Sequence, residues 1–257
     1  MSYILEHSGT RRFEIKKRLG AGGMGVVYEA FDRERGTAVA LKTLTSLDPS
    51  SLYRFKREFR AVADVVHENL VELYELVSED DQWFFSMELV PSATDFLDWV
   101  WGSPSSSEHT ASGLLLKKRL PTPASPDAAT EPMPWGSSPS ERGSRLSETA
   151  GISSSGPRPD LRRLREGFRQ LLNGLLAVHG AGLLHRDVKP SNVLVTQDGR
   201  VVLCDFGIVA DNGERVMNGF IMGTPAYMAP EQASCGTALP AADWYAAGVM
   251  LFEALTG

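Results

Sequence analysis

Hydrophobic and polar residues alternate through the first fifty positions in the way that β-strands require. In RRFEIKKRLG and GVVYEAFDRERGTAVALKTL, apolar side chains recur at about every second position, the repeat of a strand with one buried face. The ERGT sequence inside the second stretch indicates a turn. Two more strands are predicted at 71–78 and 83–89, joined by the turn SEDDQ. The pattern therefore predicts a small sheet.

The spacing becomes helical at 51–67, in SLYRFKREFRAVADVVH, and Ser50 or Ser51 is the expected N-cap. A second amphipathic helix is predicted from Asp160 to Gly180, with Gly180 as its C′ residue. The apolar residues expected on one face are Leu52, Phe55, Phe59, Val62 and Val66 in the first helix, and Leu161, Leu164, Phe168, Leu171, Leu172, Leu175 and Leu176 in the second. A short hairpin, VLVTQDGRVVL, comes later, and an apolar helix begins near Asp243 after an irregular stretch at 208–240.

Residues 102–159 have a different composition from their flanks. They are rich in serine and proline and poor in aromatic residues, so they lack the apolar surface that a core needs. We interpret this segment as a disordered insertion. The cluster LLLKKRL inside it is either a docking element or a transiently helical patch without a role.

The overall composition narrows the class of protein. Among 257 residues, 26 Lys and Arg face 32 Asp and Glu, a net charge of −6, so no basic field indicates a nucleic-acid partner. The two cysteines, Cys204 and Cys235, exclude a disulfide framework. The N-terminus lacks the pattern of a signal peptide, and the apolar runs fall short of the ~20 residues that span a bilayer. We expect a cytoplasmic protein without a membrane segment.

The first candidate site is a glycine-rich turn, GAGGMG at 20–25. The chain continues as a strand after it, whereas a dinucleotide-binding turn leads into a helix. Backbone N–H groups of such a hairpin can lie over phosphates; the alternative is a merely flexible turn. Lys42, at the end of the apolar strand AVALK, needs an anion, and Glu58 on the next helix is a candidate partner. The alternative is two unrelated surface charges.

The second candidate site is HRDVKPSN at 185–192, which places Asp187, Lys189 and Asn192 on a loop. A base, a cation and an amide suit a metal-bound phosphate. Asp205, in DFG at the end of the following hairpin, adds a carboxylate that suits Mg²⁺. In isolation, DFG and the later GTPAYMAPEQ also fit ordinary loops.

Together, GAGGMGVV, VALK, Glu58, HRDVKPSN, DFG and APE occur in the order of the protein-kinase signature set. The chain resembles a eukaryotic-type (Hanks-type) serine/threonine protein kinase in the style of the bacterial members, over residues 13–101 and 160–257. The resemblance implies an α+β, bilobal protein-kinase fold. Its N-lobe, an antiparallel sheet with one helix, and the hinge would occupy 10–90. A mainly helical C-lobe, truncated at its C-terminal end, would start at 91–101 and continue at 160–257, interrupted by the insertion.

The resemblance also implies roles. Lys42, held by Glu58, would contact the phosphates of ATP, and Asn192 and Asp205 would bind Mg²⁺. Asp187 would take the proton of a Ser or Thr hydroxyl on a protein substrate, and Lys189 would neutralise charge on the transferred phosphoryl group. The residues implied to surround the nucleotide, besides Lys42, are Leu19, Gly20, Ala21, Gly22, Gly23, Met24, Gly25, Val27, Ala40, Met87, Glu88, Val90 and Leu194.

Structural roles are implied as well. Asp243 matches the aspartate that tethers the HRD backbone in the family, and Val62, Leu73, His185 and Phe206 match its apolar stack. Cys204 is interpreted as a small packing residue, because a redox role needs an exposed thiol with a low pKa. Autophosphorylation and self-association are further expectations, with the serine-rich insertion as a candidate target.

The sequence departs from the family pattern in two places. No Ser, Thr or Tyr lies between Gly207 and Gly223, so we hypothesise that phosphorylation there is not needed and that Asp211 or Glu214 substitutes as a partner of Arg186. The chain also stops at Gly257, which would leave Glu231 without its usual arginine and uncover Trp244, Val249 and Phe252. We interpret the chain as a fragment of a longer protein rather than a degraded kinase.

Two other functions compete with an active protein kinase. One is a nucleotide-binding pseudokinase or scaffold, which the incomplete C-lobe favours. The other is a small-molecule kinase such as an antibiotic phosphotransferase. That class shares the aspartates but lacks the GTPAYMAPEQ segment, so it is the less favoured alternative.

Overall fold

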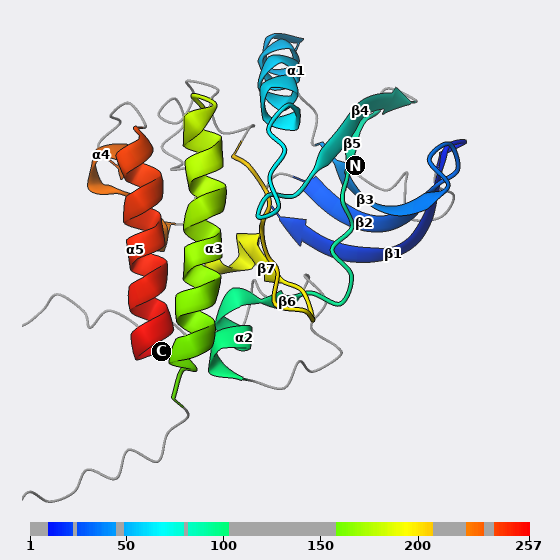
Figure 1. Ribbon diagram of the computed structural model, residues 1–257. Coiled ribbons are helices and arrows are strands. Elements are labelled where there is room, and N and C mark those ends of the chain that lie inside the picture. Colours follow the sequence, from blue (N-terminus) through cyan, green and yellow to red (C-terminus); the bar gives the residue numbers. More distant parts are fainter. Residues whose placement is uncertain are drawn as a thin grey trace, which may run out of the picture.

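The computed structural model describes residues 10–22, 25–44, 49–79, 82–102, 158–207, 225–233 and 239–257. These residues form two lobes (Figure 1): an antiparallel sheet accompanied by helix α1, and a mainly helical part in which α3 and α5 run side by side. This is the α+β, bilobal arrangement that the sequence predicts.

The N-lobe sheet has five strands, β1 (Phe13–Gly22), β2 (Gly25–Asp32), β3 (Thr37–Thr43), β4 (Leu73–Glu79) and β5 (Gln82–Met87), in the order β1-β2-β3-β5-β4. Every neighbouring pair is antiparallel. Side chains of β3 therefore alternate between the two faces. Val39 and Leu41 belong to the outer cluster with Phe13 and Phe84. The alternation places Lys42 on the opposite, inner face.

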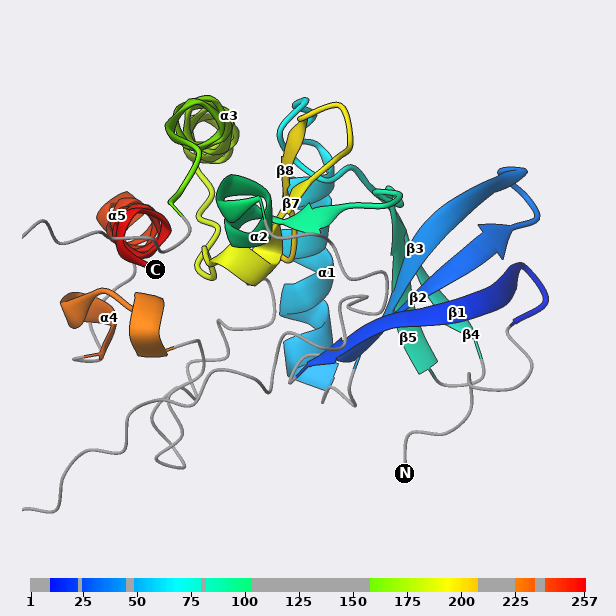
Figure 2. The same cartoon turned by 90° about the horizontal axis from the view of Figure 1, so that it is seen from below.

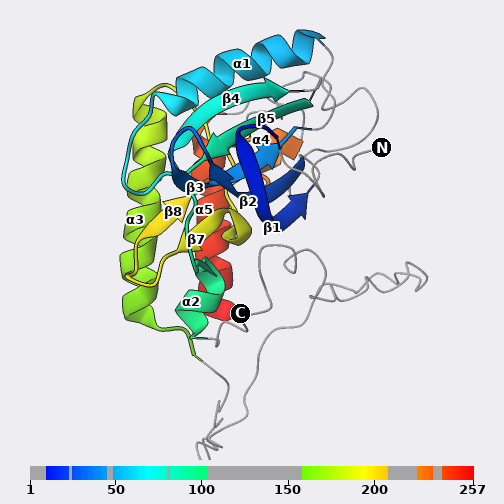
Figure 3. The same ribbon diagram turned by 90° about the vertical axis from the view of Figure 1, so that its right-hand side faces the viewer.

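Helix α1 (Pro49–Ala63) lies along β4 and β5 on the inner side of the sheet (Figure 3). Its Phe59 ring lies 5.4 Å from that of Phe85 on β5, and this contact between aromatic rings fixes the helix on the sheet. Two predictions at its ends are wrong. Ser50 and Ser51 lie inside the first turn because the helix begins at Pro49, a residue well suited to that position. Val66 is 80% exposed because the helix ends before it.

The C-lobe contains α2 (Phe96–Trp101), α3 (Leu161–Gly180), α4 (Pro230–Ala233), α5 (Pro240–Thr256) and the short 3₁₀ turns η1 (Pro190–Asn192) and η3 (Pro225–Tyr227). A second sheet, β6 (Thr94–Asp95), β7 (Val193–Val195) and β8 (Val201–Leu203), lies beside α2 (Figure 2). Strands β7 and β8 form the predicted hairpin. The segment before β4 joins this sheet through a bridge between Leu70 and Leu203, which connects the two lobes.

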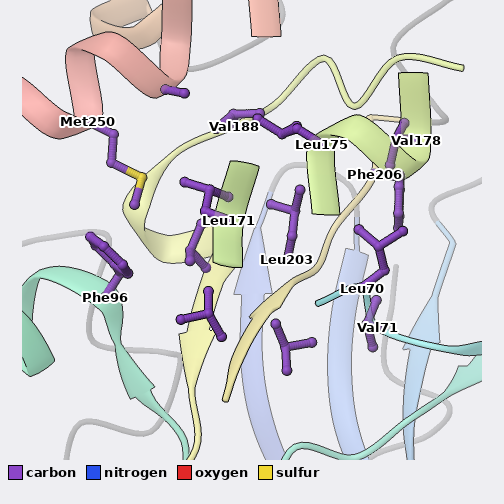
Figure 4. Close-up of a cluster of buried hydrophobic side chains, with 14 of the residues drawn as sticks. Leu70, Val71, Phe96, Leu171, Leu175, Val178, Val188, Leu203, Phe206 and Met250 are labelled. Atoms are coloured by element: carbon purple, nitrogen blue, oxygen red, sulfur yellow. The ribbon is translucent and has the colours of Figure 1, made fainter. Parts of the chain in front are cut away.

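The core of the C-lobe is centred on α3 (Figure 4). Leu171 and Leu175 are fully buried against the β7–β8 hairpin and α5, as the helical pattern predicts. Leu161 and Leu176 are instead 64% and 58% exposed, because the apolar stripe in the sequence is wider than the face that the lobe covers. The chain turns not at Gly180, the predicted C′ residue, but at Gly182, whose φ of 74° is in the left-handed region.

The chain leaves and re-enters the fold at neighbouring points around the serine-rich insertion. Gly102 ends α2 with a left-handed φ of 62°, and the N–H of Asp160 donates to the carbonyl of Val100 at 2.8 Å. Residues 103–157 lie outside the described part of the chain, so disorder there stays a prediction.

Helix α5 begins at Pro240, three residues before the predicted start. Trp244 packs edge-on against the His179 ring at 5.1 Å, so, contrary to the prediction, its ring is partly covered. Phe252 is 67% exposed, as the prediction says. Among the described helices, α5 included, none is long and apolar enough to cross a membrane.

Candidate active site

Lys42 and Asp205 meet between the lobes. The Lys42 ammonium donates to a carboxylate oxygen of Asp205 at 2.7 Å. The lysine side chain is only 7% exposed, whereas that of Asp205 is 34% exposed. A buried ammonium is costly unless an anion compensates it, and this ion pair supplies the anion. The sheet and the loop after β8 therefore contribute to one site.

The predicted pairing of Lys42 with Glu58 is not the one that this structure forms. The Glu58 carboxylate lies 3.8 Å from the Arg186 guanidinium, and the described ion-pair partner of Lys42 is Asp205. Two cations and two carboxylates approach one another here, so the position of α1 decides which pairs form. Sequence spacing alone does not specify that position.

The HRDVKPSN loop gathers its polar side chains around Asp187. The Lys189 ammonium donates to Asp187 Oδ2 at 2.6 Å, and the Asn192 amide donates to the same oxygen at 2.9 Å. Asn192 also donates to the Asp187 backbone carbonyl at 2.8 Å. Among the described residues, both side-chain donors use Oδ2. Oδ1 of Asp187 is therefore available to accept a further hydrogen bond. The predicted trio thus forms one bonded group.

Backbone hydrogen bonds join this loop to Asp205. The Cys204 N–H donates to the Asn192 carbonyl at 2.8 Å, and the Gly207 N–H donates to the His185 carbonyl at 2.9 Å. A Cβ on Gly207 would lie 3.2 Å from that carbonyl oxygen, tighter than most such contacts, so the glycine permits the approach. The contacts therefore run without a break from Lys42 through Asp205 to Asn192 and Asp187.

Two residues of this network have strained backbones. Arg186 has a φ of 68° and Asp205 a φ of 60°, in the left-handed region that non-glycine residues rarely adopt. Each such residue costs about 1–3 kcal/mol and persists only where its surroundings impose it. The strain therefore coincides with the bonded groups of the site.

Asp243 on α5 binds the backbone of the HRDVKPSN loop, as the resemblance implies. Its two carboxylate oxygens accept the N–H groups of His185 and Arg186, both at 2.8 Å. The His179 ring makes a third contact at 2.8 Å. The carboxylate is buried, and these donors satisfy it. Helix α5 thus fixes the backbone next to Asp187.

His185 is fully buried, and burial lowers its pKa. Its Nε2 lies 3.1 Å from the Cys204 carbonyl, which can only accept, so Nε2 carries the proton. Nδ1 then accepts from the Asp187 N–H at 3.4 Å. The ring lies 4.9 Å from that of Phe206, and Val62, Leu73 and Phe206 belong to one buried cluster. These are the four residues of the predicted apolar stack.

Cys204 is a packing residue, as interpreted from the sequence. Its thiol donates to the Asn192 carbonyl at 3.2 Å, and burial raises its pKa. A thiol with a raised pKa is a poor nucleophile and a poor redox sensor.

The residues implied to surround a nucleotide come from β1, β2, β3 and β5 of the N-lobe sheet, from the segment after β5, and from β7 of the second sheet. Val27 on β2 is paired with Lys42, and Ala40 on β3 is paired with Met87. Leu194 is on β7, and Glu88 and Val90 follow β5. Leu19, Gly20, Ala21 and Gly22 are on β1, whereas Gly23 and Met24 lie outside the described residues.

Gly25 at the end of this turn has a packing reason to be glycine. Its φ is 137°, and a Cβ there would lie 1.9 Å from the Thr43 carbonyl oxygen. The N–H of the neighbouring Val26 donates to the Thr43 hydroxyl oxygen at 3.0 Å. Part of the glycine motif is therefore explained by the contact between β2 and β3 alone.

The donor set fits a hard divalent cation. The Asn192 amide nitrogen binds Asp187, so the amide oxygen remains available to coordinate a cation. Lys42 binds one of the two Asp205 carboxylate oxygens, which leaves the other for the cation. One or two protein oxygens completed by phosphate is the set that Mg²⁺ uses in nucleotide sites. Within the described segments, no group of three or more His, Cys, Asp or Glu side chains could hold a metal.

Some predicted residues cannot be placed. Thr224, Asp211, Glu214 and Cys235 lie outside the described segments. Other contacts were missed at the sequence level because no local motif signals them. They include the bond from the Tyr227 hydroxyl to Glu253, the contact of His179 with Asp243, and the contacts of Arg200 described below.

Comparison with known proteins agrees with this geometry. The family model described as protein kinase domain matches residues 13–115 and 147–257. The chain belongs to the protein kinase domain family. The match is interrupted between 115 and 147, inside the serine-rich insertion.

Relatives of the chain include two mycobacterial proteins. The chain is 32% identical over 251 residues to the serine/threonine-protein kinase PknL of Mycobacterium tuberculosis, covering 96% of this chain and 49% of PknL. It is 32% identical over 256 residues to PknA of the same organism, covering 96% of this chain and 47% of PknA. The chain therefore spans about half the length of these curated relatives.

A solved structure shows the same fold. The kinase domain of Mycobacterium tuberculosis PknI superposes with a TM-score of 0.60 at 22% identity, covering 95% of this chain and 74% of that chain.

Proposed function

We propose that this chain is the catalytic part of a serine/threonine protein kinase, which transfers the γ-phosphoryl group of Mg·ATP to hydroxyls of protein substrates. The observation that carries the proposal is the continuous network from Lys42 through Asp205 and Asn192 to Asp187. Phosphoryl transfer requires mainly positioning and charge stabilisation, and this network supplies both kinds of group.

On the nucleotide side, Lys42 supplies a positive charge for the phosphates. Its ammonium is nearly buried, so its attraction for an anion is less screened than at the surface. Ala40 and Met87 provide an apolar wall next to it, and the backbone after β5, at Glu88 and Val90, provides polar groups for the base.

On the substrate side, Asp187 takes the proton of the attacking hydroxyl. Its Oδ1, which receives no side-chain donor from the described residues, is the acceptor, while Lys189 and Asn192 fix the carboxylate through Oδ2. The Lys189 ammonium also compensates negative charge that develops on the transferred group. Lys189 and the names of the relatives both support Ser and Thr as acceptors.

Asn192 and Asp205 are the residues that would hold Mg²⁺. When bound, a divalent cation neutralises phosphate charge and orients the transferred group. The strained backbone of Asp205 directs its carboxylate toward the same space that Lys42 faces.

A phosphate-transfer assay with a matched pair of variants tests the proposal. With radiolabelled ATP and a generic basic protein, Asp187→Asn should lower the rate by a factor of about 10² or more, because it removes the base from a positioned group. Asp64→Asn, an exposed aspartate after α1, is the control and should keep the wild-type rate. Equal transfer by the wild type and Asp187→Asn would remove Asp187 from its role.

One observation favours a second candidate, a nucleotide-binding scaffold. Glu58 pairs with Arg186 and Lys42 with Asp205, whereas the transfer role assigned to Lys42 has Glu58 as its partner. A scaffold would bind a fluorescent ATP analogue without transferring phosphate from ATP. Binding together with transfer that depends on Asp187 excludes it.

A further inference from the structure

Arg200 uses its whole guanidinium group on two segments that lie where the two lobes meet. It lies in the turn between β7 and β8. Its two terminal nitrogens donate to the two carboxylate oxygens of Glu88, at 2.5 and 3.1 Å. Its Nε donates to the backbone carbonyl of Glu68 at 2.7 Å. All three guanidinium nitrogens therefore have an acceptor.

The two acceptors lie on two different segments that meet the C-lobe. Glu68 is in the segment that leads from α1 to β4 within the N-lobe, and this segment rests on β8 through bonds of 2.9 Å from Leu203 N to Asn69 O and 3.0 Å from Val71 N to Leu203 O. Glu88 is the first residue after β5, on the segment that passes from the N-lobe sheet to the C-lobe. Arg200 thus joins both segments to the C-lobe at one point.

The base of the Arg200 side chain is itself fixed. The Arg200 N–H donates to the Thr196 hydroxyl at 3.0 Å, and its carbonyl accepts from the Thr196 N–H at 2.9 Å. A side chain that starts from a closed turn and ends in a bidentate ion pair has little freedom left. Such a pair is stronger than a typical surface ion pair because of its geometry.

The Glu88 backbone is fixed from the other side as well. Its N–H donates to the carbonyl of Glu72 at 2.8 Å, while its carboxylate is bound by Arg200. With the amide and the side chain both bound, the Glu88 Cα is held from two sides, which restricts the backbone from which the following peptide, with the Glu88 carbonyl, extends. That carbonyl is one of the groups assigned above to the nucleotide base.

We propose that Arg200 is a positioning residue for nucleotide binding, which acts by fixing the hinge backbone at Glu88. The inference rests on the proposed function for the identity of the ligand. Its structural basis, the clamp of Arg200 on Glu88 and Glu68, does not depend on that function. The pKa of Arg200 is raised by its bond to Glu88, which agrees with a tight pair.

The test compares variants of Arg200 by their kinetics toward ATP. Arg200→Ala should raise the KM for ATP by about three- to tenfold, within the range of coupling between contacting residues, with kcat nearly unchanged. Arg200→Lys should show an intermediate effect, because it keeps the charge but loses the planar fork. The exchange Arg200→Glu with Glu88→Arg should recover part of the affinity that Arg200→Glu alone loses.

Arg169→Ala is the matched control. Arg169 also makes a two-point contact with a glutamate, Glu166, but on the exposed surface of α3. Its removal should leave the KM for ATP unchanged. An equal KM in Arg200→Ala and wild type overturns the inference, and so does a rise in KM for ATP and protein substrate alike that tracks a fall in Tm.

A second readout separates this inference from the proposed function. Amide hydrogen exchange at residues 86–90 should be faster in Arg200→Ala than in wild type and unchanged in Arg169→Ala, with or without nucleotide. Unchanged exchange at the hinge overturns the inference even if the chain is an active kinase. If the wild type neither binds nor transfers phosphate from ATP, the proposed function fails and Arg200 is not a nucleotide-positioning residue, whatever the exchange shows.

Discussion

The Lys42 ammonium lies 2.7 Å from the carboxylate of Asp205, a residue 163 positions later in the chain. The first belongs to the inner face of the N-lobe sheet and the second to the loop after β8. A nearly buried cation requires such an anion, so this pair links the approach of the two lobes to the chemistry of the site. The remaining groups are arranged around it by backbone hydrogen bonds.

The partner of Glu58 leads to the first prediction. If transfer requires Glu58 to hold Lys42, the pair with Arg186 must open during the reaction. Glu58→Gln should then lower the initial rate of phosphate transfer by about 10- to 100-fold, because a misplaced Lys42 loses its alignment. Radiolabelled ATP measures the rate.

Glu166→Gln, which removes an exposed carboxylate on α3, serves as the control and should keep the wild-type rate. A Glu58→Gln enzyme as fast as wild type would mean that Lys42 needs no support from Glu58. The arrangement with Lys42 on Asp205 would then be the working one.

The second prediction separates two reasons for a glycine. Gly25 and Gly36 both have positive φ, 137° and 68°, but only at Gly25 would a Cβ meet the backbone, at 1.9 Å from Thr43 O. Gly36→Ala should cost about 1 kcal/mol for the left-handed conformation alone. Gly25→Ala should cost roughly 3 kcal/mol or more, because the clash adds to the backbone strain.

Urea unfolding of the two variants measures both costs. Equal losses would show that backbone conformation, rather than the contact between β2 and β3, requires glycine at position 25.

Much of the fold was predictable because it depends on residues that lie close together in the sequence. The alternation in AVALK gives a strand with Lys42 on the inner face, and the turn in VLVTQDGRVVL gives the β7–β8 hairpin. The grouping of Asp187, Lys189 and Asn192 follows from their closeness in sequence. In each case, neighbours along the chain remain neighbours in space.

What was missed depends on tertiary placement. The choice of Glu58 between Lys42 and Arg186 depends on where α1 lies on the sheet. The exposure of Leu176 depends on how much of α3 the lobe covers. Arg200 lies in a turn without a motif, and only the fold brings it to Glu88, 112 positions away. No pattern in a single sequence encodes these relationships.

The third prediction concerns Asp243. Its side chain is 3% exposed and accepts two backbone N–H groups as well as contacting His179. Asp243→Asn would place an amide N–H₂ against one of these donors and leave it without an acceptor, which costs about 2–4 kcal/mol. Chemical denaturation measures the loss, and Asp98→Asn, at an exposed aspartate, should change stability little. Equal stabilities of the two variants would contradict a tethering role.

The last prediction concerns the pH dependence of stability. Burial raises the pKa of Asp95 from 3.8 to about 6, and the carboxylates of Asp98 and Glu253 add to this effect. A carboxyl group with a raised pKa in the folded state favours folding when it is protonated. That contribution is complete below the unfolded pKa of 3.8 and is lost as the pH rises through 6.

Asp95→Asn should therefore stabilise the protein at pH 7.5 by about 2 kcal/mol, because it removes the ionised, buried carboxylate. The Asn oxygen can still accept the bond from the Leu97 N–H that caps α2. The gain should shrink as the pH falls below 6 and vanish near pH 3.8, as urea unfolding at a series of pH values would show.

Asp160, the N-cap of α3, is the control with the opposite sign. Bonds from the N–H groups of Arg163 and Arg162 lower its pKa, so its ionised form supports folding above its unfolded pKa, and this support is lost as the pH falls. Asp160→Asn should therefore lose a little stability at pH 7.5, where Asp95→Asn gains. A gain from Asp95→Asn that is the same at pH 4 and pH 7.5 would show that the substitution acts through packing and not through ionisation of the buried carboxylate.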